Sequence, residues 1–325
     1  MKRPRVLPAF SKEERERAHV LLATRVAFMM GRKFEEGDWP YVYCKAKEIP
    51  EQSWSNLNID VTYEGLGVEH KMLGQPSDRP LRSVCGTRLM HPSLTRSIRL
   101  PSLDADAETV MREVLGQYVE LLKERKRKLK ENAPDKEPDL RTGWLLWHKS
   151  LQEFLYFEEE TLEPEPSDYT AEWKESGGGS GKASKNLWVY EKDTGQKKYS
   201  ITTSAGAKIQ PYFDVPPPNE PNLYIFRVQG EEVSPGCIRI WVSVATAREL
   251  QEIVGDLNVE NLGLVIANAA AEPADDQAVG GPPREEARPI EITSESYSLL
   301  TATFPNAVSD EHMVQMLLTG LRKPS

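Results

Sequence analysis

Residues 54–73 read WSNLNIDVTYEGLGVEHKML. This stretch reads as two short extended segments, 56–63 and 67–73, joined by a tight turn. Glu64-Gly65-Leu66-Gly67 supplies the glycines that a hairpin turn needs. The sequence therefore predicts a β-hairpin here.

Three charged side chains, Asp60, Glu69 and Lys71, lie on the two extended segments of this hairpin. Side chains two positions apart in a strand share a face, so Glu69 and Lys71 should face one way and His70 the other. Folding of the hairpin brings Asp60 near Glu69. Two carboxylates and an ammonium group at one point suit metal-assisted phosphodiester cleavage, because Mg²⁺ prefers oxygen ligands and lowers the pKa of a bound water. The simpler alternative is an ordinary surface pair of Glu69 and Lys71, worth about a few tenths of a kcal/mol.

Composition limits the class of protein. The chain has 325 residues, of which 39% are hydrophobic and 28% charged, as in a soluble globular protein. No apolar run approaches the ~18 residues that a membrane-spanning helix requires, and the N-terminus has no apolar stretch typical of a secretory signal. Cys44, Cys85 and Cys237 are too few and too far apart for a disulfide framework or a zinc site. We expect an intracellular protein without membrane contact.

Charge is distributed unevenly. The net charge is −9, yet residues 79–99 contain five arginines and no acid, and 182–208 contain six lysines. Basic segments of this kind can contact nucleic-acid phosphates, and Lys208 and Gln210, two apart on a predicted strand, could contact base edges. The predicted DNA-binding residues are Arg82, Arg88, Arg96, Arg99, Lys182, Lys185, Lys208 and Gln210. A polar surface strand is the alternative for the last two.

Hydrophobic patterns predict the remaining elements. We expect helices over 11–32, 106–130, 143–159, 246–254 and 309–321, strands over 187–190, 198–203, 207–215, 222–229 and 237–244, a short strand or loop over 39–46, and a loop over 271–289. Residues 161–186 read as a flexible connection between a catalytic core, 1–160, and a strand-rich region, 187–325. That region would complete the core sheet, recognise DNA, or both.

Other catalytic and nucleotide-binding patterns are missing. The five histidines show no metal-binding spacing, and no GxSxG nucleophile motif occurs. The glycine-rich run 177–182 lacks the phosphate-loop pattern, so no nucleotide cofactor is expected.

The spacing Asp60-x8-Glu69-x-Lys71 resembles that of the PD-(D/E)XK nuclease superfamily, and within it the type II restriction endonucleases. The segments TTSAGAKIQPYFDVP (202–216) and NLYIFRVQ (222–229) also look like restriction-enzyme sequence. One departure is Ile59, where the family pattern has proline. The resemblance implies an α/β fold with a mixed central sheet flanked by helices and further C-terminal strands and helices.

The resemblance also implies residue roles. Asp60 and Glu69 would be Mg²⁺ ligands together with the backbone carbonyl of His70, and Lys71 would position the attacking water. The family often adds an acid from the N-terminal helix, for which the candidates are Glu14, Glu16, Glu35 and Glu36.

The expected function is sequence-specific cleavage of double-stranded DNA to 5′-phosphate and 3′-hydroxyl ends, in the cytoplasm of a prokaryotic cell. A homodimer is expected on a palindromic site, because two-fold symmetry then matches the site. Two alternatives remain: a structure-specific repair or recombination nuclease of the same superfamily, and a non-catalytic DNA-binding or scaffold protein.

Overall fold

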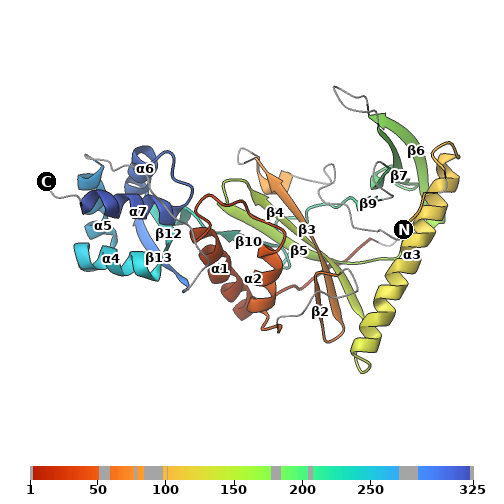
Figure 1. The fold of residues 1–325 in the computed structure, drawn as a ribbon, viewed down its shortest axis with the longest axis horizontal. Helices are drawn as coiled ribbons and strands as arrows, with labels where there is room; N and C mark the ends of the chain where they lie inside the picture. The colour runs from red at the N-terminus through yellow and green to blue at the C-terminus, as the bar shows by residue number, and fades with distance from the viewer. Residues whose placement is uncertain are drawn as a thin grey trace.

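The computed structural model describes residues 3–50, 59–76, 79–83, 98–100, 102–176, 184–203, 208–270 and 285–322. Within these ranges the fold is mixed α/β, with a mixed central sheet flanked by helices. Figure 1 shows the central sheet in the middle of an elongated molecule, with α3 and a second sheet at one end and the C-terminal elements at the other. The mixed α/β class expected from the sequence is confirmed.

The central sheet is built around the predicted hairpin. Strands β2 and β3 form the hairpin, and α3 connects β3 to β4, which lies parallel to β3. Strand β5 then pairs antiparallel with β4, and β1 and β10 both pair with β5. The strands are β1 Val6–Leu7, β2 Val61–Tyr63, β3 Leu66–Gln75, β4 Asp139–His148, β5 Glu153–Glu160 and β10 Tyr224–Arg227.

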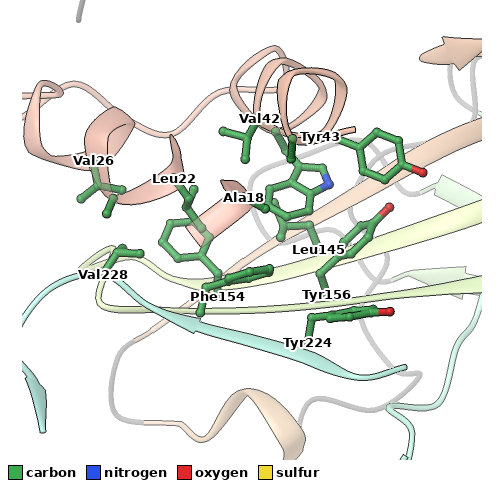
Figure 2. Close-up of a cluster of buried hydrophobic side chains, with 14 of the residues drawn as sticks. Ala18, Leu22, Val26, Val42, Tyr43, Leu145, Phe154, Tyr156, Tyr224 and Val228 are labelled. Atoms are coloured by element: carbon green, nitrogen blue, oxygen red, sulfur yellow. The ribbon is translucent and has the colours of Figure 1, made fainter. Parts of the chain in front are cut away.

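Two helices, α1 and α2, cover one face of this sheet. Helix α1, Lys12–Ala27, begins with a capping box: Glu14 N–H donates to the Ser11 hydroxyl, and the Glu14 carboxylate accepts from Ser11 N–H. Residues 39–46, expected as a strand or loop, instead belong to helix α2, Asp38–Ala46. Figure 2 shows side chains from both helices packed on Phe154 and Tyr156 of β5. Trp39, Val42, Tyr43 and Ala46 of α2 are buried at helical spacing, which explains the helix.

The helix predicted over 143–159 is wrong, because this segment forms β4, a turn and β5. Both faces of the central sheet are covered, so consecutive residues such as Trp144, Leu145 and Leu146 are all buried. A strand buried on both faces loses the apolar–polar alternation that identifies strands in sequence. The aromatic side chains of residues 143–159 therefore point to both faces of a sheet and do not form one face of a helix.

Helix α3, Ala107–Asn132, confirms the helix expected over 106–130, with Asp106 as its N-cap. It packs against a second, antiparallel sheet of β6 Tyr169–Ser176, β7 Ser184–Glu191, β8 Lys197–Thr202 and β9 Lys208–Pro211. The predicted flexible connection 161–186 is wrong for residues 169–176, which form β6, and for 184–186, which begin β7. The turn Asp193-Thr194-Gly195 joins β7 to β8, which correspond to the strands expected over 187–190 and 198–203.

The C-terminal elements have a core of their own, and we call residues 231–322 the C-terminal unit. Its sheet contains β11 Glu231–Ser234, β12 Cys237–Ser243 and β13 Ala287–Thr293, and its helices are α4 Val244–Val254, α5 Val259–Ala269, α6 Ser294–Thr303 and α7 Asp310–Leu321. The sequence analysis predicted β12, α4 and α7 but missed α5 and α6. It also assigned 287–289, the start of β13, to a loop.

A glycine in β4 permits close packing beside the hairpin. A Cβ atom on Gly143 would lie 2.5 Å from the Tyr156 hydroxyl and 2.7 Å from the His70 ring. Both neighbours are buried and cannot move without disturbing the core. We expect Gly143→Ala to lower the free energy of unfolding by about 1–3 kcal/mol, measured by chemical denaturation. Gly195→Ala is unsuitable as a control because of its positive φ, so Gly37→Ala, in open space, is used and should change stability far less.

Asp310, at the start of α7, is buried at the junction between the C-terminal unit and the central sheet. Its carboxylate accepts from Gly230 N–H at 2.9 Å and from the Tyr297 hydroxyl at 3.2 Å. Burial disfavours the charged form and raises the pKa of Asp310 to about 7, although these hydrogen bonds oppose the shift.

The raised pKa predicts a pH dependence of stability. An unfolded aspartate has a pKa of about 3.9, so between about pH 4 and pH 7 the native state retains a proton that the unfolded state has lost. Stability therefore decreases as pH rises through this window, by up to ~1.4 kcal/mol per pH unit from this group. In Asp310→Asn, the free energy of unfolding should decrease less between pH 4.5 and pH 7.5 than in the wild type, as measured by urea unfolding. Parallel profiles for the two proteins would contradict the assignment.

Candidate functional site

The β2–β3 hairpin places the predicted acids opposite each other. Its register pairs Val61 with Val68 and Tyr63 with Leu66, so Asp60 follows as the position facing Glu69. The turn residues Glu64 and Gly65 have φ values of 45° and 85°, as a two-residue hairpin turn of the primed type requires. The hairpin predicted from the sequence is confirmed.

Asp60 lies at the solvent-exposed start of β2 and is held by the backbone of β3. Its Oδ2 accepts the His70 backbone N–H at 2.6 Å. The pKa of Asp60 is raised to about 6, first because the surrounding protein partly desolvates the carboxylate and second because Glu69 is nearby, while the His70 N–H and Lys71 oppose the shift. The side chain still reaches solvent. Asp60 is thus fixed in position, and its ionised form is disfavoured by burial and by the negative charge of Glu69.

Glu69 and Lys71 share the face of β3 toward α3, as predicted. The Lys71 ammonium forms an ion pair with Glu69 Oε1, and Arg125 Nη1 of α3 donates to Glu69 Oε2 at 2.7 Å. These side chains are 14% (Glu69), 11% (Lys71) and 5% (Arg125) exposed. The sequence analysis did not predict Arg125, because it lies 56 residues away within the basic end of α3.

Glu159 lies on the same sheet face, two strands from Glu69. The register pairs Glu69 with Thr142 and Thr142 with Glu159. Burial raises the pKa of Glu159 to about 7, despite a 3.0 Å hydrogen bond from Trp144 Nε1. A cavity of about 230 Å³ opens here and is lined in part by Thr142, Trp144, Glu159 and Lys198. The sequence analysis missed Glu159 because it assigned this segment to a helix.

His70 faces the opposite side of β3, as predicted, and belongs to a buried polar network. Its Nε2 lies 3.0 Å from the Tyr156 hydroxyl, which donates to Glu158 Oε1 at 2.8 Å. Arg141 Nη1 donates to the other oxygen of Glu158 at 2.9 Å. Burial lowers the pKa of His70 to about 3, so its ring is neutral at pH 7. This network supports the backbone that holds Asp60.

The four candidates for an additional acid at the predicted metal site lie in different environments. Glu14 caps α1 and pairs with Lys47, Glu16 is exposed on α1, and Glu35 pairs with Arg32. Glu36 is the one whose charge contributes to the raised pKa of Asp60. Glu36 is therefore the best-placed of the four to join Asp60.

The predicted DNA-binding residues occupy several places. Arg82 is exposed and lies in the short 3₁₀ helix Leu81–Ser83. Arg99 is also exposed, and its backbone N–H and C=O form hydrogen bonds with the Gln117 side chain of α3. Lys185 of β7 lies over the Trp173 ring, and Gln210 is half-buried on β9. Arg88, Arg96, Lys182 and the side chain of Lys208 lie outside the described residues. Arg99, Lys185 and Gln210 thus lie on or beside α3 and the second sheet, whereas Arg82 lies in a separate short helix.

Comparison with known proteins gives no assignment. No family model matches. No curated protein and no solved structure matches either. In the described ranges, no group of three or more histidine, cysteine, aspartate or glutamate side chains is placed to hold a metal ion. Among the same residues, no helix has the length and apolar character needed to cross a bilayer.

Proposed function

We propose that the protein is a Mg²⁺-dependent endodeoxyribonuclease of the restriction type. The observation that carries the proposal is the placement of Asp60 opposite Glu69 on one hairpin, with Lys71 ion-paired to Glu69. The spacing of these residues in sequence resembles the PD-(D/E)XK pattern. The order of hairpin, long helix α3 and parallel strand β4 is compatible with a sheet that supports such a site.

The donor set fits a hard divalent cation. Asp60 and Glu69 offer carboxylate oxygens, which Mg²⁺ prefers. Desolvation raises the pKa of Asp60 first, and repulsion from Glu69 raises it second. A cation between two such groups would relieve that repulsion. Asp60 and Glu69 would hold the ion with the His70 carbonyl. Glu36 acts on Asp60 through its charge but does not form a group of three acidic ligands with this pair. When bound, Mg²⁺ supplies a water of lowered pKa and screens the charge of the phosphate.

Each side chain then has a role in hydrolysis. The His70 N–H orients the Asp60 carboxylate, and Arg125 fixes one oxygen of Glu69. Lys71 orients the attacking water and stabilises the negative charge that develops on phosphorus oxygens. In-line attack breaks the bond from phosphorus to the 3′ oxygen and leaves 5′-phosphate and 3′-hydroxyl ends. Because Glu69 and Lys71 are largely covered, the phosphate would approach from the exposed Asp60 side, at the β2 edge.

Digestion of mapped double-stranded DNA tests the function. The proposal expects cleavage with Mg²⁺, none with EDTA, and a defined fragment pattern. A smear, or preference for branched substrates, would favour a repair or recombination nuclease. Absence of Mg²⁺-dependent cleavage on linear, supercoiled and branched DNA would favour a non-catalytic protein, in which Glu69, Lys71 and Arg125 form a structural ion network. Sedimentation with and without DNA would test the expected homodimer.

A further inference from the structure

A cavity of about 660 Å³ lies between the central sheet and the C-terminal unit, and we call it the junction cavity. On one side it is lined by the segment after α1 and by the β4–β5 turn. On the other it is lined by α6, the α6–α7 loop and the start of α7. Its volume falls within the ~300–1,000 Å³ typical of small-molecule sites, which often form where two parts of a chain meet.

The junction cavity has aromatic side chains on both sides. Phe34 and Trp147 line the first side, with ring centroids 5.4 Å apart and planes inclined by 50°. Tyr297 and Phe304 line the second side. Trp147 and Tyr297 are half-buried and their rings can stack on a planar heterocycle, whereas Phe34 and Phe304 are buried.

Cationic side chains lie around the same cavity. Arg32, Lys33 and Lys149 all line it, and both lysines are exposed. Arg32 is held by two hydrogen bonds to Asp38, of 2.8 and 3.0 Å, whereas neither lysine forms an ion pair among the residues that the structure describes. The acid that lines the cavity, Asp310, already accepts from Gly230 and Tyr297. Two lysines are thus available for an anionic group.

A strained turn adds a separate observation. Leu151, in the β4–β5 turn, has a φ of 59° and lines the cavity. Bulky residues rarely adopt this left-handed conformation, and such strain is concentrated at ligand-binding and switch sites.

We propose that the junction cavity binds a mononucleotide, with the base among the aromatic side chains and the phosphate near Lys33 and Lys149. This site is distinct from the hairpin carboxylates. Gly74, which lines the cavity, is five residues beyond Glu69 along β3, or about 16 Å at the usual strand rise. The ligand would contact both the central sheet and the C-terminal unit, and would therefore stabilise their association.

Calorimetry and thermal unfolding of the full chain test the proposal, with AMP as the probe. We expect saturable AMP binding and a midpoint of unfolding that rises with AMP concentration. Adenosine lacks the phosphate and inorganic phosphate lacks the base. Each should therefore bind at least about ten-fold more weakly than AMP. Absence of saturable AMP binding would overturn the proposal, and so would equal affinity for adenosine, because the lysines would then have no part.

Charge reversal locates the site. Lys33→Glu and Lys149→Glu should each weaken AMP binding by about ten-fold or more, since a charge-assisted contact to phosphate is lost. Both positions are exposed, so the variants should fold. Lys12→Glu is the matched control: it makes the same charge change on an exposed lysine at the opposite end of α1, about 22 Å along the helix from Ala27. Wild-type affinity in both cavity variants, or an equal loss in the control, would refute the assignment. Neither result depends on DNA cleavage.

Discussion

Asp60→Asn and Lys71→Met should each reduce Mg²⁺-dependent DNA cleavage by at least about 100-fold. The first replaces a carboxylate ligand by a neutral amide of the same shape. The second removes the ammonium group beside Glu69 while keeping a side chain of similar length. Both effects should appear in the single-turnover cleavage rate of mapped DNA, with DNA affinity little changed, because the groups act on the scissile phosphate rather than along the duplex.

Two controls separate chemistry from folding. Glu64→Gln alters an acid in the turn of the same hairpin, and Lys128→Met removes a partly exposed lysine from α3. Both should cleave at close to the wild-type rate. Because Asp60 is exposed, Asp60→Asn should also unfold near the wild-type midpoint. Cleavage by either site variant at the wild-type rate would remove these residues from the mechanism.

Arg141→Ala should lower the free energy of unfolding by about 3–5 kcal/mol, the usual cost of leaving a buried charge without its partner. Glu158 is fully buried, and Arg141 Nη1 lies 2.9 Å from its Oε2. Burial already raises the pKa of Glu158 in the wild type, and Arg141 opposes that shift. Loss of Arg141 should raise this pKa further.

The sign of the pH effect follows from that pKa. A carboxyl whose folded-state pKa is raised is least costly when protonated, so Arg141→Ala should destabilise less at pH 5 than at pH 8. Denaturant unfolding at both pH values measures the difference. Arg227→Ala breaks a more exposed pair with Glu153 and should cost about 0–1 kcal/mol. An equal decrease in the free energy of unfolding in the two variants would mean that the Arg141–Glu158 pair contributes no more than an exposed ion pair.

Local signals in the sequence predicted the hairpin and α3. The glycine-containing turn fixed the register that sets Asp60 opposite Glu69, and the two-residue period placed Lys71 beside Glu69 and His70 on the other face. The helices expected from residues 11, 106 and 309 likewise begin there, with Ser11, Asp106 and Ser309 as their N-caps. These features depend on residues that are neighbours in the chain, so they can be predicted from a single sequence.

Features that depend on distant packing were not predictable in the same way. β4 and β5 are buried on both faces, which removed the alternation and suggested a helix. β6 reads as polar because only one of its faces packs against α3, and its partner β7 follows a glycine-rich segment. Arg125 and Glu159 reach the face of Glu69 only through the α3 crossover and the sheet register. No local pattern predicts such contacts.

Binding of Mn²⁺ in the absence of DNA tests most directly whether Asp60 and Glu69 form a cation site. Calorimetric titration of the wild-type protein and Asp60→Asn with Mn²⁺ would be compared under the same conditions at pH 7.5, where the Asp60 carboxyl, with a pKa of about 6, is ionised. We predict one saturable site in the wild type that is lost in the variant. Equal binding by the two proteins, or no binding by the wild type, would contradict a metal-dependent mechanism at this hairpin.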